Sequence, residues 1–494
     1  MAERGLALGF VGLGWHPDIG GVESHTHDLA RELGARGHRL HALALDTRAG
    51  LEPYTTAVGV HQGVRVTRMA YRYHDHRALA DLVASPRAEE VVGTWAEESR
   101  LDLVHVHHAS GFGLGILPAL HATSVPAVMT LHDFWPLCPR GQMLRVDGEV
   151  CAAATPERCA PCLAATWRHL MPGSGGELRG PRGEALASDD VAAGDDVAGS
   201  DDVAGSDDVA GSDEDAARAR GEFALQCLAS ARRLFTPSQA TRAAFARAGL
   251  DPRSIEVVEN GIDVDELARG VAALRARAAP RAGLHLGVLG TVLPSKGALE
   301  LARAVVAARV PGLVLEIHGA LPSYHGDSRY VEALQTLAAA EPSVRVHGPF
   351  EHERLAEILA TLDGVAAPSR WNEVYGLTVR EARAAGLPVL VSDAGALPDV
   401  TESGAAGLVI PADDQAAWVA ALWRFADPAQ RAAWGGEPRR PRSARAMALQ
   451  LERAYCEVVR AARGRLPPLE FVPGEERGAP GGVGRLLRRL FGAS

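Results

Sequence analysis

Two glutamates, Glu373 and Glu381, flank a turn made of Gly376, Leu377 and Thr378. An apolar run comes before the turn and a helical pattern follows it, so the turn is expected to open a helix. A helix N-terminus presents unpaired backbone N–H groups and a partial positive charge, which suit a phosphate. Since each helical residue advances 1.5 Å, Glu381 is expected about 7 Å along the helix from Gly376. One acid is therefore predicted on the loop and the other on the helix, with an anion site between them.

This arrangement fits a ligand with a diphosphate in the middle and a hydroxyl-rich group at each end. Carboxylates form strong hydrogen bonds with hydroxyl groups, so each glutamate can hold one end of such a ligand. A nucleotide sugar has that shape.

Lys296 is the candidate cation for the diphosphate. It follows an apolar run at 284–289 and precedes a helical pattern, so it is expected on a loop beside the phosphate. A metal ion held by an Asp-x-Asp pair is the alternative, and Asp263 and Asp265 have that spacing. They lie at a connection between domains, which favours an exposed helix start. The sequence therefore predicts metal-independent chemistry, to which Arg370, just ahead of the loop, is a further candidate contributor.

Candidate site residues also follow apolar runs in the first half of the chain. Gly20 and Gly21 open a helical pattern, where the absence of side chains lets a phosphate approach the backbone. His132 comes directly after a run at 127–131 and can hydrogen-bond a sugar or stabilise a developing charge. Both positions are expected at the same cleft.

Three further histidines, His105, His107 and His108, crowd another strand end. Of these, only His107 is expected to face the cleft. The H-x-H spacing suits a metal, but no third ligand is evident in the sequence. His107 is therefore interpreted as a packing or acceptor-side histidine.

Four cysteines, Cys138, Cys151, Cys159 and Cys162, follow His132 with the spacing C-x12-C-x7-C-x2-C. In a cytoplasmic protein, clustered thiols are more often metal ligands than disulfides. Four thiolates suit tetrahedral zinc, and an iron–sulfur cluster uses the same donors. The spacing predicts a structural metal that pins a loop on the acceptor side, with unligated or redox-paired cysteines as the alternative.

The length and charge of the chain indicate several domains and one unusual insert. A chain of 494 residues is expected to form two or three domains. Residues 188–215 carry eleven acids and no base, so this segment accounts for the formal net charge of −10. It repeats Asp-Asp-Val-Ala-Gly-Ser with little apolar surface to bury, which predicts a disordered insert. The remainder is close to neutral, and no nucleic-acid partner is expected.

Targeting signals are not evident in the sequence. No stretch supplies about 18 uninterrupted apolar residues, and the first residues lack the pattern of a signal peptide. A cytoplasmic location is therefore expected. The segment 464–494 is rich in Pro and Gly and ends in a short basic amphipathic stretch. That end is interpreted as a frayed or docked terminus, with a weak peripheral contact at the inner membrane surface as the alternative.

Short apolar runs alternate with helical patterns along the chain, which predicts parallel sheets with crossover helices. The expected domains are an N-terminal acceptor-side domain (1–260), a connector (261–282), a C-terminal donor domain (283–440), a terminal helix (441–463) and the tail (464–494). The expected strands are 6–11, 40–45, 103–106, 127–131 and 233–236 in the first half, and 284–289, 314–317, 344–347, 365–367, 389–392 and 408–410 in the second.

The segment containing Glu373 and Glu381 resembles the E-x7-E region of retaining GT-B glycosyltransferases, in particular family 4 (glycosyl transferases group 1). Other motifs follow in the order of that family over residues 5–170 and 220–425. They are Pro17-Asp-Ile-Gly-Gly-Val-Glu-Ser-His, Thr236-Pro-Ser, Asn260-Gly-Ile-Asp, Gly290-Thr-Val-Leu-Pro-Ser-Lys-Gly and Leu397-Pro-Asp. The resemblance implies an α/β protein with two doubly wound, Rossmann-like domains facing a cleft, and a donor held mainly by the second domain.

The resemblance also implies roles for individual residues. Glu381 would bind the nucleotide ribose, Glu373 the transferred sugar and Lys296 the diphosphate, while His132 matches the cleft histidine. Gly21 and the Gly376-Leu377-Thr378 turn would complete the donor site. The family often has an arginine after the glycine that matches Gly290, whereas this chain has Thr291, so one of two usual cations is missing.

The implied reaction moves a sugar from a UDP- or GDP-sugar to an acceptor hydroxyl of a sugar, a lipid-linked glycan or a small molecule. It needs no catalytic cofactor. No residue of the sequence is identified as a nucleophile. The resemblance therefore implies attack on the same face of the sugar, guided by the leaving phosphate. A nucleotide-sugar epimerase and a catalytically silent nucleotide-sugar-binding subunit are the alternatives. A dinucleotide-dependent oxidoreductase is disfavoured, because no G-x-G-x-x-G motif follows either first strand.

Overall fold

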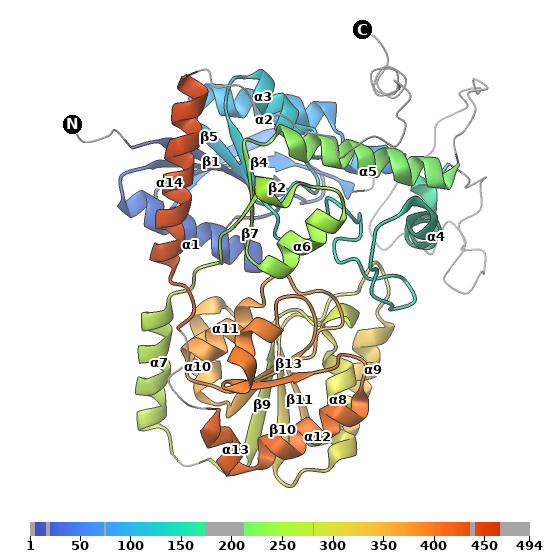
Figure 1. Cartoon of the computed structure of the whole chain (residues 1–494), viewed down its shortest axis with the longest axis vertical. Coiled ribbons are helices and arrows are strands. Elements are labelled where there is room, and N and C mark those ends of the chain that lie inside the picture. The colour runs from blue at the N-terminus through green and yellow to red at the C-terminus, as the bar shows by residue number, and fades with distance from the viewer. Residues whose placement is uncertain are drawn as a thin grey trace.

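The computed structural model describes residues 5–15, 20–73, 76–172, 212–279, 281–434 and 440–464. These residues form two α/β domains, one above the other in Figure 1, each built on its own sheet. Within the described residues no helix is long and apolar enough to cross a membrane.

The N-terminal sheet has eight strands in the order β3-β4-β2-β1-β5-β6-β7-β8. Every neighbouring pair is parallel except β3 and β4, which are antiparallel. The strands are β1 (Ala7–Val11), β2 (Arg39–Asp46), β3 (Thr56–His61), β4 (Val64–Ala70), β5 (Leu103–Val106), β6 (Ala127–Thr130), β7 (Arg233–Thr236) and β8 (Ile255–Val257).

The C-terminal sheet has six parallel strands in the order β11-β10-β9-β12-β13-β14. They are β9 (Leu284–Leu289), β10 (Leu313–His318), β11 (Val344–Gly348), β12 (Gly364–Ala367), β13 (Val389–Ser392) and β14 (Gly407–Ile410). This is the doubly wound order 3-2-1-4-5-6: the chain adds β9, β10 and β11 toward one edge of the sheet, and then returns to add β12, β13 and β14 toward the other edge. Ligands of such sheets bind beyond the carboxyl ends of the strands at that reversal.

Helices cover both sheets (Figure 1). The helices of the first half are α1 (Gly21–Ala35), α2 (Pro86–Glu98), α3 (Ile116–Ala122), α4 (Pro156–Thr166), α5 (Asp213–Ser230) and α6 (Gln239–Arg247). Those of the second half are α7 (Val264–Arg277), α8 (Ala298–Ala308), α9 (Arg329–Ala340), α10 (Leu355–Ala360), α11 (Leu377–Ala384), α12 (Gln415–Ala426), α13 (Pro428–Ala433) and α14 (Ala444–Arg463).

The final helix returns to the first domain. Figure 1 shows α14 running upward beside α1. Its apolar face, which includes Met447, Leu451 and Tyr455, is buried with Leu8 and Phe10 of β1 in one core cluster. The first domain is therefore built from two separate stretches of the chain.

The sequence predicted the buried strands closely but missed three others. β3 is exposed along nearly its whole length, and β4 follows it in a hairpin. β8 has only three residues, and one of them is buried. The exposed β3 and the very short β8 leave little apolar pattern. β4 is largely buried, but Arg65 and Arg68 interrupt its apolar run, so it did not stand out as a strand.

One boundary of the predicted acidic insert was wrong. Asp213, Glu214 and Asp215 form the first turn of α5, where Ser212 caps the helix and bonds to Asp215. Acids are favourable there because they face the positive end of the helix. The rest of the insert, residues 17–19 of the glycine motif and the tail beyond residue 464 lie outside the described residues.

Candidate functional site

Glu373 lies on the loop after β12. This loop is close to the point between β9 and β12 where the strand order of the C-terminal sheet reverses. The Glu373 side chain is buried, and three donors reach the same oxygen, Oε1. They are the Lys296 Nζ, the Ser369 hydroxyl at 2.7 Å and the Trp371 indole Nε1 at 2.9 Å. These bonds fix the carboxylate in one orientation and leave Oε2 for another hydroxyl.

The charge state of Glu373 follows from the same contacts. Burial alone would raise the pKa of this carboxyl, but the Lys296 charge and the hydrogen bonds outweigh burial and lower the pKa below its usual value. Glu373 is therefore an anion at neutral pH and can accept hydrogen bonds from a ligand.

Lys296 is held where β9 leads into α8, on a 3-10 turn at Pro294–Lys296. The next residue, Gly297, has φ +69°, and a Cβ there would lie 2.0 Å from the Pro368 carbonyl oxygen. Only glycine fits this close approach between the loops that follow β9 and β12. The glycine thereby allows Lys296, on the loop after β9, to reach Glu373, on the loop after β12.

The predicted Gly376-Leu377-Thr378 turn does open a helix. Gly376 has φ +75° and precedes α11, which has no side-chain cap at its start. The turn is partly exposed, so its backbone N–H groups are available to a ligand. The site expected from the sequence, a helix N-terminus between two glutamates, is present in the fold.

Glu381 faces the other domain from the side of α11. It is buried, and the His352 Nε2 lies 4.0 Å from its Oε1. Burial raises the pKa of Glu381, His352 opposes that rise, and the charge of Asp28 on α1 adds to it. The carboxylate is thus poorly compensated in the ligand-free protein, in contrast to Glu373.

The N-terminus of α1 meets that of α11 across the gap between the domains. Gly21 is exposed, and a Cβ at this position would lie 3.5 Å from the Leu377 Cδ1. Two helix N-termini, the Lys296 ammonium and two carboxylates therefore surround one region. The domains are also joined nearby by bonds from Thr241 to the Val374 carbonyl and from Tyr375 to the Asn260 carbonyl.

His132 lies after β6 and is bonded to His107, which follows β5, with 3.1 Å between His132 Nε2 and His107 Nδ1. His25 on α1 packs against both rings, at centroid distances of 4.6 Å to His132 and 5.3 Å to His107. Burial lowers the pKa of His25 to about 4 and, with the neighbouring imidazoles, brings the pKa values of His107 and His132 well below the usual range. All three rings are therefore neutral near pH 7.

The neighbouring histidines differ in their partners. His105 is bonded at both ring nitrogens, to Tyr455 OH at 2.6 Å and to Thr130 Oγ1 at 2.7 Å, so it packs the core. His108 is 2.9 Å from Asp133. Burial lowers the pKa of His108, but Asp133 outweighs burial and the net change is upward. Of the three crowded histidines in the sequence, His107 is the one that contacts His132.

The four cysteines lie in one region but not at ligand spacing. Cys159 and Cys162 are three residues apart on α4, and no disulfide joins any of the four. Burial, followed by the charges of the other three thiols, raises the pKa of Cys159 to about 12. Among the described residues, the group with three ligand atoms within 4.8 Å of one another is formed by histidines instead.

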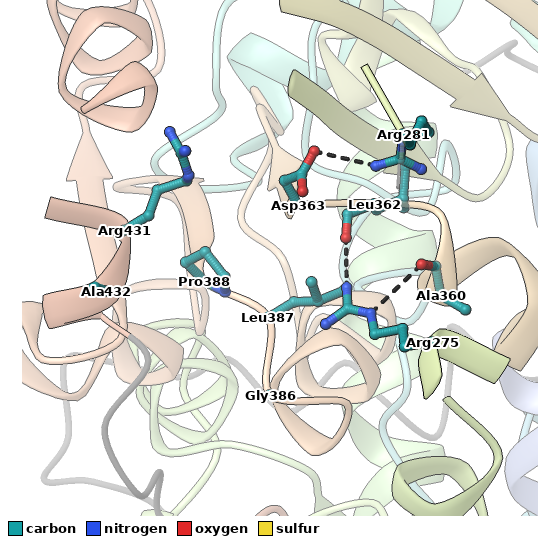
Figure 2. A pocket seen from close by; sticks show the side chains of 10 residues that line it. All are labelled: Arg275, Arg281, Ala360, Leu362, Asp363, Gly386, Leu387, Pro388, Arg431 and Ala432. Atoms are coloured by element: carbon teal, nitrogen blue, oxygen red, sulfur yellow. Dashed lines mark hydrogen bonds and ion pairs between the residues drawn. The ribbon is translucent and has the colours of Figure 1, made fainter. Parts of the chain in front are cut away.

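A pocket of about 290 Å³ lies at the opposite end of the C-terminal sheet (Figure 2). Its walls include Leu362 and Asp363, just before β12, and Pro388, just before β13. Arg275 donates to the Leu362 carbonyl, and Arg281 pairs with Asp363. These two arginines therefore hold the segment that leads into β12. The pocket lies at the amino ends of the strands and is not part of the candidate site.

Two family models match the chain. The model described as Glycosyltransferase Family 4 matches residues 19–154, and the one described as Glycosyl transferases group 1 matches residues 283–427. The chain thus carries a glycosyltransferase family 4 domain in its first half and a glycosyl transferases group 1 domain in its second half. The first match holds α1 and the three clustered histidines, and the second holds Lys296 and both glutamates.

Curated relatives of this chain include enzymes named D-inositol 3-phosphate glycosyltransferase. The protein from Xylanimonas cellulosilytica is 27% identical over 84% of this chain and 85% of its own length. The one from Stackebrandtia nassauensis is 32% identical, but the match spans 37% of this chain and 43% of the relative. The chain thus spans less than half the length of the first relatives that it matches.

Solved GT-B structures share the glycosyltransferase fold. Sucrose-phosphate synthase from Thermosynechococcus elongatus has a TM-score of 0.65 and 19% identity, over 92% of this chain and all of that chain. Anabaena HepE in complex with UDP and glucose has a TM-score of 0.58 and 18% identity, over 91% of this chain and 99% of that chain. At these identities the likeness establishes the two-domain architecture.

Sequence reasoning missed several residues of the site. Ser369 and Trp371, which fix Glu373, lie within four residues of it and carry the donor groups that a buried carboxylate needs. His25 is separated from His107 and His132 by some eighty residues or more, and its polar position on α1 gave no sign of burial. Arg370 was a candidate cation, but it pairs with Asp413 and Glu300.

Proposed function

We propose that this glycosyltransferase moves a sugar from a nucleotide diphosphate donor to an acceptor hydroxyl, with retention of configuration and without a catalytic metal. The observation that carries the proposal is the arrangement around Glu373. Three donors hold Oε1, and Oε2 remains for a sugar hydroxyl beside Lys296 and two helix N-termini. Buried carboxylates with this geometry are suited to orient a polyhydroxylated ligand.

The donor would lie with its diphosphate between α1 and α11. As the bond to the sugar breaks, negative charge grows on the departing phosphate. Lys296 and the backbone N–H groups near Gly376 and Gly21 would stabilise that charge, because they are already aimed at the same region. Glu381, farther along α11, would accept the ribose hydroxyls. The relative with UDP bound supports a uridine nucleotide as the first donor to test.

The acceptor would enter from the side of the N-terminal domain. Retention then follows from attack on the same face as the departing phosphate, whose oxygen takes the acceptor proton as the new glycosidic bond forms. His132, which follows β6, would hydrogen-bond the transferred sugar. The name of the curated relatives makes D-inositol 3-phosphate a first acceptor to test.

We propose that the four cysteines hold a structural zinc ion or iron–sulfur cluster, which requires their sulfur atoms to move closer together than they lie in this structure. Their loop packs against the second domain, where Tyr324 bonds to Gln142 at 3.1 Å and the Arg140 guanidinium lies over the Tyr324 ring. Ion binding would stabilise this bridge on the acceptor side. Metal analysis of gently purified protein should find zinc or iron that is lost when Cys159 and Cys162 are both replaced by serine. Equal metal content in wild type and double variant would exclude the proposal.

Calorimetric titration with UDP, GDP, ADP and TDP tests the function directly. One of these nucleotides should bind, and Lys296→Ala should weaken that binding by at least tenfold, because a charge-assisted contact contributes about 1.5–3 kcal/mol. Donor turnover should then depend on added acceptor. The proposal fails if no nucleotide binds, or if Lys296→Ala binds as tightly as wild type.

A further inference from the structure

His25, His107 and His132 form a compact imidazole cluster at the carboxyl ends of the N-terminal strands. One ring nitrogen from each lies within 4.8 Å of those of the other two, and this is the one such group of potential metal ligands in the described part of the chain. His25 comes from α1, His107 follows β5 and His132 follows β6. Three separate elements of the sheet's centre therefore hold the cluster.

Several ring nitrogens in this cluster have no hydrogen-bond partner within the described ranges of the chain. Both nitrogens of His25 and Nε2 of His107 are buried and unpaired. Leaving a buried polar atom unpaired costs about 1–3 kcal/mol, so an unpaired group signals a partner that binds there. The contrast with His105, which is bonded at both nitrogens in the same core, shows that this sheet can satisfy a buried imidazole.

We propose that these three histidines bind a divalent transition ion of the zinc class, and that the bound ion inhibits sugar transfer by occupying His132. The inhibitory part rests on the function proposed above. Zinc prefers imidazole nitrogens at about 2.0–2.1 Å and accepts three histidines with one position left for water. Magnesium and calcium require oxygen ligands, which this cluster does not supply.

The observed distances suit such an ion. Two ligands of a tetrahedral zinc ion lie about 3.3 Å apart, and His107 Nδ1 lies 3.1 Å from His132 Nε2. His25 completes the set by a small shift of its ring toward the other two. His132 is only partly buried, so an ion can reach the cluster from the region between the domains.

Binding of Zn²⁺ to metal-stripped, full-length protein tests the site without using activity. The Cys159→Ser/Cys162→Ser double variant serves as the background, so that thiols do not contribute. In this background the protein should bind one Zn²⁺ per chain, and His25→Phe should weaken that binding by about 100-fold or more. His121→Gln removes an exposed histidine outside the cluster and serves as the matched control.

Cobalt provides a second measurement. Co²⁺ in the cluster should show the visible absorption of a tetrahedral nitrogen site and lack the near-ultraviolet band of a thiolate site. Phenylalanine fills the volume of His25 without its unpaired nitrogens, so the variant is expected to fold, and circular dichroism checks this. Should His25→Phe fail to fold, His107→Gln replaces it in the same titration.

The outcomes separate the two proposals. Equal Zn²⁺ binding by the background protein and a folded cluster variant overturns the metal site, whatever the nucleotide titrations show. Zn²⁺ binding without any nucleotide binding upholds the ion site and overturns the transferase function. If Zn²⁺ binds at the cluster but leaves donor turnover unchanged, the inhibitory role is wrong.

Discussion

Replacing Glu381 by glutamine should separate ligand affinity from stability. Glu381 is buried, its carboxylate has no hydrogen-bond partner among the residues that the structure describes, and burial raises the pKa of its carboxyl. An amide of the same shape removes a poorly compensated charge, so the ligand-free variant should be at least as stable as wild type. If Glu381 binds the ribose, one lost charge-assisted hydrogen bond costs about 1.5–3 kcal/mol, or about 10- to 150-fold in nucleotide affinity.

The effect on stability should depend on pH in a defined direction. Because folding raises the pKa of Glu381, the folded protein binds the extra proton more tightly than the unfolded chain. This contribution is complete below the unfolded pKa of 4.5 and is lost as the pH rises through the folded pKa. The gain from Glu381→Gln should therefore be present at pH 7.5 and shrink as the pH falls toward 4.5.

Glu373→Gln is the matched control, since the same change is made at a fully compensated carboxylate. It weakens three hydrogen bonds to one oxygen and removes the attraction to Lys296, which solvent screens because Lys296 is partly exposed, so the expected loss is about 2 kcal/mol. Chemical denaturation measures stability and calorimetric titration measures nucleotide affinity. The reasoning is refuted if Glu381→Gln binds nucleotide like wild type, or if it destabilises the ligand-free protein as much as Glu373→Gln does.

Three further changes test other parts of the structure. Gly21→Ala should fold normally, because the new Cβ makes an ordinary contact at 3.5 Å. Its nucleotide affinity should nevertheless fall at least tenfold, because the methyl group enters the proposed phosphate region. Unchanged affinity in a titration would contradict this. Gly297→Ala should lower the free energy of unfolding by more than the roughly 1–2 kcal/mol expected for a left-handed residue. The reason is that its Cβ would lie 2.0 Å from the Pro368 carbonyl oxygen. A denaturation midpoint equal to that of wild type would rule out this close approach. Tyr455→Phe leaves His105 Nδ1 without its buried partner and should cost about 1–3 kcal/mol in the same measurement, whereas no loss would mean that this bond contributes nothing.

The sequence predicted the parallel sheets and the helix-opening turn at Gly376 well because both depend on local patterns. Buried parallel strands are nearly continuous apolar runs, and β5, β7, β9 and β13 begin and end at the predicted residues. The turn at Gly376 combined a glycine with a following helical pattern, which is a local signal for a helix start. Family 4 membership, first inferred from ordered motifs, agrees with the two matching family models.

The parts that could not be predicted depend on contacts between distant residues. A third ligand for His107 was not evident from the sequence, because His25 lies on another element and reaches His107 only through the fold of the sheet. The roles predicted for Glu373 and Glu381 from resemblance remain predictions. What the structure adds is the difference in their surroundings, which local spacing cannot express: one carboxylate is bonded three times and the other is not.

The return of α14 to the first domain has a consequence for biosynthesis. The ribosome makes β1 to β8 first, but the apolar surface that receives Met447, Leu451 and Tyr455 stays uncovered until the whole second domain has been translated. At about 5–20 residues per second, the roughly 190 intervening residues take about 10–40 s. Throughout that interval the nascent first domain exposes the apolar surface that α14 later covers. Chaperones that hold unfolded chains bind surfaces of this kind.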